Sequence, residues 1–330
     1  MVLFHGGLHE PSPSLLTGWS FEPLQLIPLA LIALVYAKRV RTLRRRGTPP
    51  PRWRVWIFAL GVALVLFALA SPIDPIGEQQ FLFVHMLQHV LLGDLAPLCF
   101  VVGLTGLILQ PLLRFRPVNA LRVLTHPFVA LPLWALDLGA WHVPFMYQAA
   151  LHHDSVHAVQ HLCFALAGGL MWAPVVETLP GPEWFGTGFK LGYIAVVRLF
   201  ESALGNVFLW SGTVFYPFYV HEHPRWGITP LHDQALAGTV MMIEGSLVTL
   251  AALAWLFLRL AAEGELRQEL LERGLDPRTV RRAVRYGRAS ASWGVEETPA
   301  RSDREGGENT VAPAGGSRRQ ATGQELSEPR

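Results

Sequence analysis

Two five-residue strings share a pattern that could do chemistry. They are His85-Met-Leu-Gln88-His89 and His157-Ala-Val-Gln160-His161. Residues four positions apart lie on one face of an α-helix, so each string would present two imidazole rings, with an amide beside them, to one neighbour. Ionisable groups inside a membrane segment are costly and usually functional. Two such faces predict one shared metal or haem site.

The segments that carry these strings have the composition of a membrane protein. Of 330 residues, 51% are hydrophobic and 16% are charged. Seven apolar stretches approach the ~20 residues that a helix needs to cross a bilayer. They cover about residues 23–37, 55–71, 81–102, 127–142, 157–176, 191–214 and 232–260. We therefore expect an all-α, polytopic membrane helix bundle of about seven transmembrane helices, in contact with the lipid bilayer.

Two apolar segments depart from this pattern. The fourth stretch, 127–142, is short and contains Asp137, so its assignment as a span has the weakest support. The segment 104–113 is too short to cross a bilayer and is expected to be interfacial or re-entrant.

Basic residues predict the orientation of the bundle. Two loops are rich in them, with Lys38, Arg39, Arg41, Arg44, Arg45, Arg46, Arg52 and Arg54 in the first and Arg114, Arg116 and Arg122 in the second. Loops 72–80 and 143–156 contain no Lys or Arg. The positive-inside rule then places the N-terminus outside and the C-terminus in the cytoplasm. This asymmetry explains the basic residues without any nucleic-acid partner.

The same patterns divide the chain into four parts. Residues 1–22 form an extracytoplasmic N-terminal segment and residues 23–260 the seven-span transmembrane domain. Residues 261–286 are expected to form a basic cytoplasmic helix, interrupted at Gly274 and Asp276-Pro277. Residues 287–330 have too few apolar side chains to bury a core, so we expect a disordered cytoplasmic tail with no catalytic role.

Histidines gather on the outer side of this predicted topology. Of 13 histidines, all but His126 fall outside or in the outer half of the membrane. Interfacial positions suit an amphipathic ring, and this explanation is favoured for His5, His9, His152 and His153. The two strings lie on parallel spans at similar depth, and His142 ends the fourth span near them. The predicted metal ligands are His85, His89, His142, His157 and His161.

Copper is the metal that these residues favour. Imidazole binds copper, zinc and iron, and nearby thioethers add a preference for Cu(I). Met86, Met146, Met241 and Met242 lie near the same layer, although a methionine in a membrane helix more often serves packing. Cys99 and Cys163 do not share the histidine faces. Haem is the alternative ligand, and histidines confined to one side allow at most one outer-side haem.

Buried acids form a second polar layer. Asp94 and Asp137 each lie five residues inward from a histidine, about 7–8 Å deeper. In a regular helix Asp94 is rotated by about 140° from the His85/His89 face. It could orient a histidine of another helix, or close a structural hydrogen bond between spans. Arg198 and Glu201 are three residues apart and predict an ion pair, whereas Glu244 has no evident partner.

Further motifs carry a resemblance to a known family. Trp141-His142-Val-Pro144 and Asp233-Gln234 accompany the two histidine strings, as do Ala96-Pro97, Gly103, Tyr147, Met171-Trp172-Ala-Pro174 and Tyr219. Together they resemble the multi-spanning CtaG family of cytochrome c oxidase assembly factors over roughly residues 20–260. One departure is visible, because Met242 and Glu244 follow Met241 where the family tends to have Trp and Pro.

The resemblance implies a multi-pass plasma-membrane protein of a prokaryote that is needed to mature caa-type oxidase. Its partners would be cytochrome c oxidase subunits, and it would handle or deliver copper without enzymatic turnover. Asp233 and Gln234 would lie at the mouth of the histidine cluster, with Asp94, Asp137, Gln88 and Gln160 as possible supporting residues. The alternatives are a haem-binding membrane oxidoreductase and a metal- or proton-coupled transporter. A membrane protease is not favoured, since HExxH and comparable hydrolytic motifs do not occur.

Overall fold

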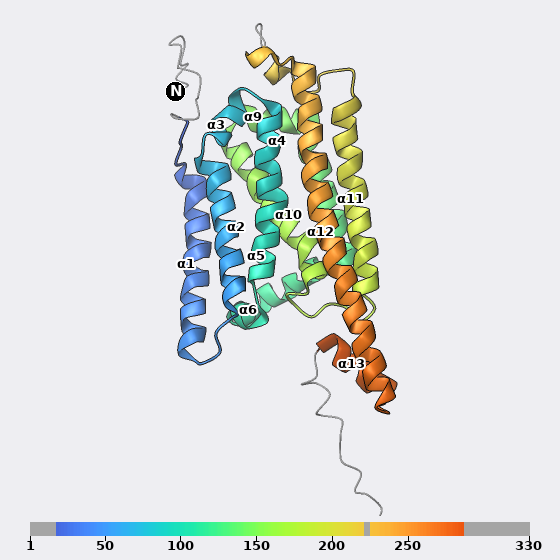
Figure 1. Cartoon of the computed structure of the whole chain (residues 1–330). Helices are drawn as coiled ribbons and strands as arrows, with labels where there is room; N and C mark the ends of the chain where they lie inside the picture. The colour runs from blue at the N-terminus through green and yellow to red at the C-terminus, as the bar shows by residue number, and fades with distance from the viewer. Residues whose placement is uncertain (1–17, 221–224, 287–330) are drawn as a thin grey trace, which may run out of the picture. The chain divides into compact units, whose positions relative to one another are not determined.

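The computed structural model describes residues 18–220 and 225–286, most of which form helices. The segments 1–17, 221–224 and 287–330 lie outside the described residues, and they include His5, His9, His221 and His223. Figure 1 shows the helices, which are α1 (Pro23–Arg45), α2 (Arg52–Ala70), α3 (Ile73–Gln79), α4 (Leu82–Val90), η1 (Leu91–Leu95), α5 (Ala96–Gly103), α6 (Gly106–Leu113), α7 (Arg116–Ala120), η2 (Leu121–Thr125), α8 (Pro127–His142), α9 (Pro144–His152), α10 (Asp154–Val176), α11 (Thr187–Trp210), η3 (Pro217–Tyr219), η4 (Arg225–Gly227), α12 (Pro230–Glu272) and α13 (Pro277–Tyr286). The described ranges contain no strand, which confirms the all-α prediction.

Six helical segments in these ranges are long and apolar enough to cross a membrane. They are α1, α2, the continuous segment Leu82–Gly103, α10, α11 and α12. The fourth predicted stretch is the exception, since α8 has 16 residues. The chain bends by 78° before α8, where Pro127 disfavours a helical conformation of the preceding residue. Counting that bent pair as one span gives seven.

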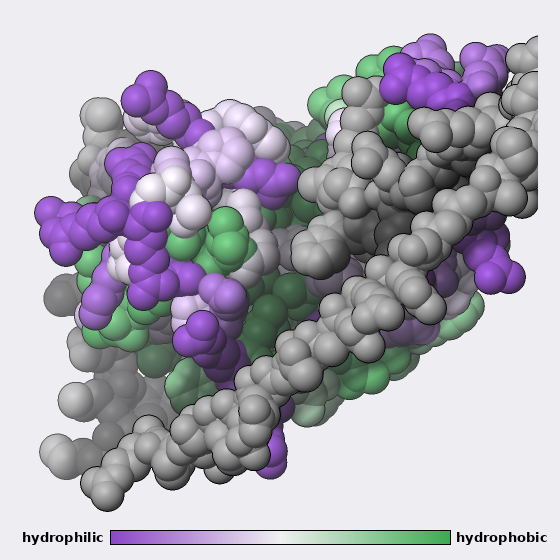
Figure 2. Space-filling view, turned by 90° about the horizontal axis from the view of Figure 1, so that it is seen from below, coloured by the Kyte–Doolittle hydropathy of each residue, from purple (hydrophilic) through white to green (hydrophobic). Residues whose placement is uncertain are grey.

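The two histidine strings lie near the beginnings of helices that run in the same direction. In Figure 1, α4 and α10 both run downward from the end of the bundle where α3 and α9 lie. The opposite end carries exposed arginines around the α1–α2 connection and after α6, namely Arg41, Arg44, Arg45, Arg46, Arg52, Arg114, Arg116 and Arg122. Figure 2 shows hydrophilic side chains gathered on the α1 and α2 side of this face.

A close helix crossing holds the two histidine helices together. A Cβ atom on Gly168 of α10 would collide with the carbonyl oxygen of Gly93 in η1. Small residues let membrane helices approach until their backbones touch. Gly93 lies four residues after His89, so this contact fixes the distance between α4 and α10 just below the rings.

A second glycine crossing joins α11 to α12. A Cβ atom built on Gly238 would lie 2.5 Å from the carbonyl oxygen of Gly205. The ion pair predicted between Arg198 and Glu201 is present at 3.9 Å, and Arg198 also donates to the Met242 carbonyl oxygen of α12 at 3.1 Å. These contacts pack α12 against α11.

The span that carries the first histidine string is interrupted by a π-helical turn. Leu91–Leu95 forms this turn between α4 and α5, where the sequence predicts an unbroken helix. A π turn closes i→i+5 hydrogen bonds, so it shifts the faces of the residues that follow it. Asp94 lies inside the turn, and its side chain therefore does not follow the rotation of a regular helix.

The described residues beyond Leu266, which are 267–286, belong to a second unit and are described by themselves. The single helix α12 continues past residue 260 and ends at Glu272, followed by Gly274 with a φ of +79°. Asp276 then accepts a hydrogen bond from the Arg278 backbone N–H at 2.9 Å and begins α13.

The Gly93–Gly168 crossing generates a first prediction. Gly168→Ala should lower the melting temperature of the detergent-purified protein, because overpacking such a contact costs about 1–3 kcal/mol. Gly169→Ala is the control, since a Cβ atom there meets nothing within 4 Å. Both changes add the same helix propensity. Equal melting temperatures of the two variants would contradict the crossing.

Candidate metal centre

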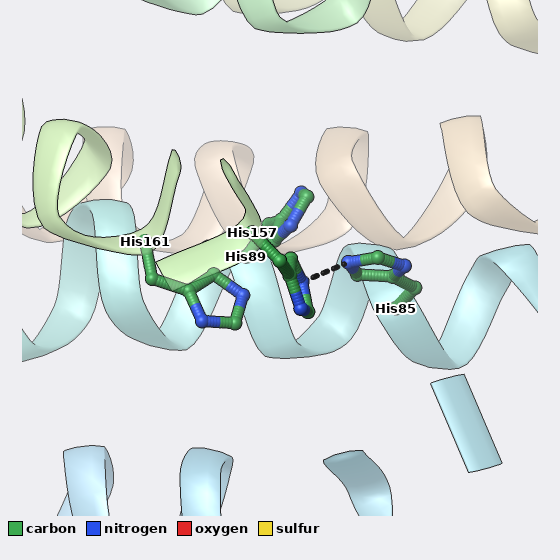
Figure 3. A group of neighbouring side chains, drawn as sticks. All are labelled: His85, His89, His157 and His161. Carbon is green, nitrogen blue, oxygen red and sulfur yellow. Dashed lines mark hydrogen bonds between the residues drawn. The ribbon is translucent and has the colours of Figure 1, made fainter. Parts of the chain in front are cut away.

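Four buried histidines meet between α4 and α10. One nitrogen from each of His85, His89, His157 and His161 lies within 4.8 Å of the other three. Their side chains are at most 5% exposed. Figure 3 shows the four rings beside one another, two from each helix. We call this group the histidine tetrad.

The spacing within each string brings two rings of the same helix together. The His85 and His89 ring centroids are 4.3 Å apart, and those of His157 and His161 are 4.1 Å apart. Packing of α10 against η1 and α5 brings the two pairs of rings together. Across the helices, the Nε2 atoms of His85 and His157 are 3.2 Å apart.

Three rings of the tetrad have a polar partner at Nδ1, on the outer side. His157 Nδ1 lies 2.5 Å from the Glu78 carboxylate of α3. His161 Nδ1 lies 3.1 Å from Gln25 Oε1 of α1. His85 Nδ1 lies 2.8 Å from the Tyr219 hydroxyl. Such partners orient metal-binding histidines and fix which ring nitrogen carries the proton.

These partners fix the proton on Nδ1. A carboxylate and an amide oxygen only accept hydrogen bonds, so His157 and His161 donate through Nδ1–H. The Tyr219 hydroxyl donates to the Gly77 carbonyl oxygen at 3.0 Å and therefore accepts from His85. Burial raises the pKa of Tyr219 well above its usual range, which keeps that hydroxyl protonated. Each of the three rings is left with a lone pair on Nε2.

Gly77 brings α3 against the tetrad. A Cβ atom on Gly77 would lie 2.9 Å from the Cα atom of His85, a distance that side chains do not tolerate. Glycine at this position lets α3 approach α4 closely enough for Glu78 to reach His157. The site is thus built from α1, α3 and η3 in addition to the two histidine helices.

His142 lies beside the tetrad but outside it. Its ring centroid is 6.3 Å from that of His89, and the four-residue group does not include it. His142 Nδ1 donates to the Leu138 carbonyl oxygen at 2.7 Å, within its own helix. The predicted set of five ligands is therefore four histidines and a separate neighbour.

The two glutamines do not join the rings in one polar face. Gln88 donates to the Ala68 carbonyl oxygen at 3.1 Å and to Asp74 Oδ1 at 2.6 Å. One residue of helix is a rotation of about 100°, which turns Gln88 away from His89 and toward α2 and α3. Gln160 is fully buried, and its amide has no hydrogen-bond partner among the described residues.

The predicted acids line a cavity on the inner side of the tetrad. Asp94 and Asp137 share this cavity with His89 and His142. Asp94 lies in the π turn Leu91–Leu95. Asp94 accepts a hydrogen bond from Trp172 Nε1, so it makes the interhelical bond that was one of its two predicted roles.

Asp233 positions the start of α4, and Gln234 holds the irregular segment that follows α11. The Asp233 carboxylate accepts hydrogen bonds from the backbone N–H groups of Leu82 and Phe83, at 2.8 and 3.0 Å. It thereby satisfies the free N–H groups at the start of α4, where a negative charge also complements the helix dipole. Gln234 bonds to backbone atoms of Thr213 and Phe215.

Sequence reasoning missed Glu78, Gln25 and Asp74. Glu78 and Asp74 are the acidic residues of loop 72–80, a segment without Lys or Arg, and that contrast was the available signal. Burial first, and the negative charge of Glu78 second, raise the pKa of Asp74 to about 7. Gln25 gives no comparable signal, since a single glutamine near the start of an apolar helix is unremarkable.

Fold and site together define a class: a polytopic α-helical membrane protein with a buried histidine tetrad near one end of the bundle. Within that class, the chain belongs to the cytochrome c oxidase caa3 assembly factor family (Caa3_CtaG), whose model matches residues 34–263. This confirms the family resemblance seen in the sequence. The description of that family names assembly of a caa3-type cytochrome c oxidase.

Two mycobacterial relatives extend the comparison. Uncharacterized proteins of Mycobacterium bovis and Mycobacterium tuberculosis are each 25% identical to the chain over 255 residues. The matched region is 71% of this chain and 38% of each relative, so the chain spans well under half of their length. No solved structure matches the chain.

The contact between Asp233 and α4 generates a second prediction. Asp233→Ala should lower the melting temperature, because loss of a side chain that caps a helix N-terminus costs about 0.5–2 kcal/mol. His232→Ala is the control, since that neighbouring side chain is exposed. A melting temperature of Asp233→Ala equal to that of the control would contradict the capping role.

The raised pKa of Asp74 generates a third prediction. The folded state holds this proton up to about pH 7, whereas the unfolded chain releases it near pH 3.8. Stability should therefore fall as pH rises from about 4 to 7 and then level off, by at most about 4 kcal/mol from this group. Melting curves of Asp74→Asn should show a weaker decline.

The matched control for Asp74 is Asp154→Asn, which changes an exposed carboxylate. Its melting temperature should follow that of the wild type across the same pH range. An unchanged decline in Asp74→Asn would show that other groups produce the pH dependence.

Proposed function

We propose that this assembly factor binds copper at the histidine tetrad and passes it to cytochrome c oxidase on the extracytoplasmic side. One observation carries the proposal. The Nδ1 partners of His85, His157 and His161 leave the Nε2 lone pairs of these three rings free, and one nitrogen of each tetrad ring lies within 4.8 Å of the others. Lone pairs that face each other at 3.2 Å repel unless a cation or a proton lies between them.

The distances fit a bare ion. Tetrahedral sites with metal–nitrogen bonds of about 2 Å have neighbouring nitrogens about 3.3 Å apart. The His85–His157 distance of 3.2 Å already matches, and the other pairs within 4.8 Å need a small contraction. An all-imidazole site without a carboxylate ligand suits copper, and copper is also the metal that an oxidase assembly factor would deliver.

Haem fits this geometry less well. Two imidazoles on opposite sides of an iron atom require nitrogens about 4 Å apart with a porphyrin between them. The cavity beside the tetrad has a volume of about 60 Å³, room for roughly two water molecules. That space does not admit a macrocycle.

Access and location follow from the surrounding residues. Glu78 and Gln25 are half-buried, so the α1–α3 edge of the tetrad is its most open side. The arginine-rich segments lie at the opposite end of the bundle, which supports an extracytoplasmic position for the tetrad in a prokaryotic plasma membrane. An oxidase subunit would approach at that edge, and the transfer requires no enzymatic turnover.

The fourth prediction tests copper binding directly. Detergent-purified protein should contain copper by elemental analysis and should show no strong haem absorption. The double variant His85→Ala/His157→Ala should bind at least one copper ion fewer than the wild type, because two ligands of the tetrad are removed from opposite helices. The control is His152→Ala/His153→Ala, which changes two exposed histidines.

Copper content unchanged in the tetrad variant would refute the shared site. A Soret band that disappears in the same variant would instead support the haem alternative. A melting curve of each variant distinguishes loss of ligands from loss of folding.

A further inference from the structure

A small cavity lies on the inner side of the tetrad. Its volume is about 60 Å³, and its lining includes His89, His142, Met86, Met241, Asp94 and Glu244. His89 therefore faces both the tetrad and this cavity. We call the space the inner cavity.

Two imidazoles of the inner cavity have nitrogens that nothing satisfies. Neither ring nitrogen of His89 has a hydrogen-bond partner in the described part of the chain, and neither does Nε2 of His142. Both side chains are more than nine-tenths buried, with exposures of 5% and 8%. Leaving such groups unpaired in a membrane bundle is costly, so these atoms point to a ligand.

The spacing of the two rings suits an ion between them. Their centroids are 6.3 Å apart. Two metal–nitrogen bonds of about 2 Å, together with about 1 Å from each nitrogen to its ring centre, give nearly the same separation. Met86 and Met241 bring thioethers to the same cavity, and a site of imidazoles and thioethers favours Cu(I).

The floor of the inner cavity supplies a compensating charge. The carboxyl groups of Asp94 and Glu244 line this cavity, and Asp94 accepts a hydrogen bond from Trp172 Nε1. Glu201 also lines the cavity, but Arg198 pairs with it. An ionised carboxylate beside the cavity would balance the charge of a monovalent cation, which an apolar medium does not tolerate uncompensated.

We propose that the inner cavity is a second copper site, in which His89, His142 and the thioethers of Met86 and Met241 bind Cu(I). The proposal rests on copper binding at the tetrad, because His89 belongs to both places. When His89 serves the inner site, His85, His157 and His161 still supply three imidazoles to the outer one. Copper would then bind at two neighbouring sites, the tetrad and the inner cavity.

X-ray absorption spectroscopy and copper analysis of Cu(I)-loaded protein in detergent test this site. Wild-type protein should bind two ions, with sulfur scattering at about 2.3 Å in the copper spectrum. Met86→Leu/Met241→Leu should bind one ion and lose the sulfur signal. Met171→Leu is the matched control, since this methionine is fully buried in the apolar core around Trp172 and does not line the cavity.

The outcomes separate the two proposals. One ion without sulfur scattering, lost in His85→Ala/His157→Ala, would overturn the inner site and leave the tetrad intact. Two ions and unchanged sulfur scattering in Met86→Leu/Met241→Leu would also overturn it. No copper in the wild type would refute the tetrad and the inner site together. Melting curves of the leucine variants confirm that each remains folded.

Discussion

Every buried ring nitrogen in a membrane bundle needs a partner, because no solvent is available to satisfy it. This constraint determines how the end of the bundle that contains the tetrad is packed. Glu78, Tyr219 and Gln25 each satisfy the Nδ1 atom of one tetrad histidine. The loops and short helices that carry these three residues therefore have to pack closely on α4 and α10. The other nitrogens of these rings have no such oxygen partner from the protein, and the proposed copper ion would bind to them.

Glycines make this arrangement sterically possible. The Gly93–Gly168 crossing sets the separation of the two histidine helices, and Gly77 lets α3 reach His85. Asp233 fixes the start of α4 by accepting two of its backbone N–H groups. Backbone packing and one helix-terminal carboxylate thus determine where the imidazoles lie, so the ligands do not have to pull the helices together themselves.

The sequence alone predicts the helical bundle and the four-residue tetrad, because both rest on local periodicity. HxxxH on two parallel spans places four rings at one depth without knowledge of any tertiary contact. His142 was predicted in the same site, but its offset depends on the crossing of α8 with α10, which no spacing encodes. Glu78 and Gln25 were missed for the same reason, since their roles arise from contacts across about 80 and 136 positions of the chain.

The predicted acids lie beside the cavity next to the rings. Asp94 belongs to the π turn Leu91–Leu95 and makes a hydrogen bond to Trp172 of α10, which is one of the two roles that the sequence left open. Ligand character therefore changes with depth, from imidazoles in the tetrad, through imidazoles and thioethers, to the carboxyl groups of Asp94 and Glu244. A cation that entered at the tetrad would therefore meet imidazoles and thioethers before it met a carboxyl group. The order of these ligands along the bundle follows from the helices that carry them, because Met86, His89 and Asp94 succeed one another on the same span.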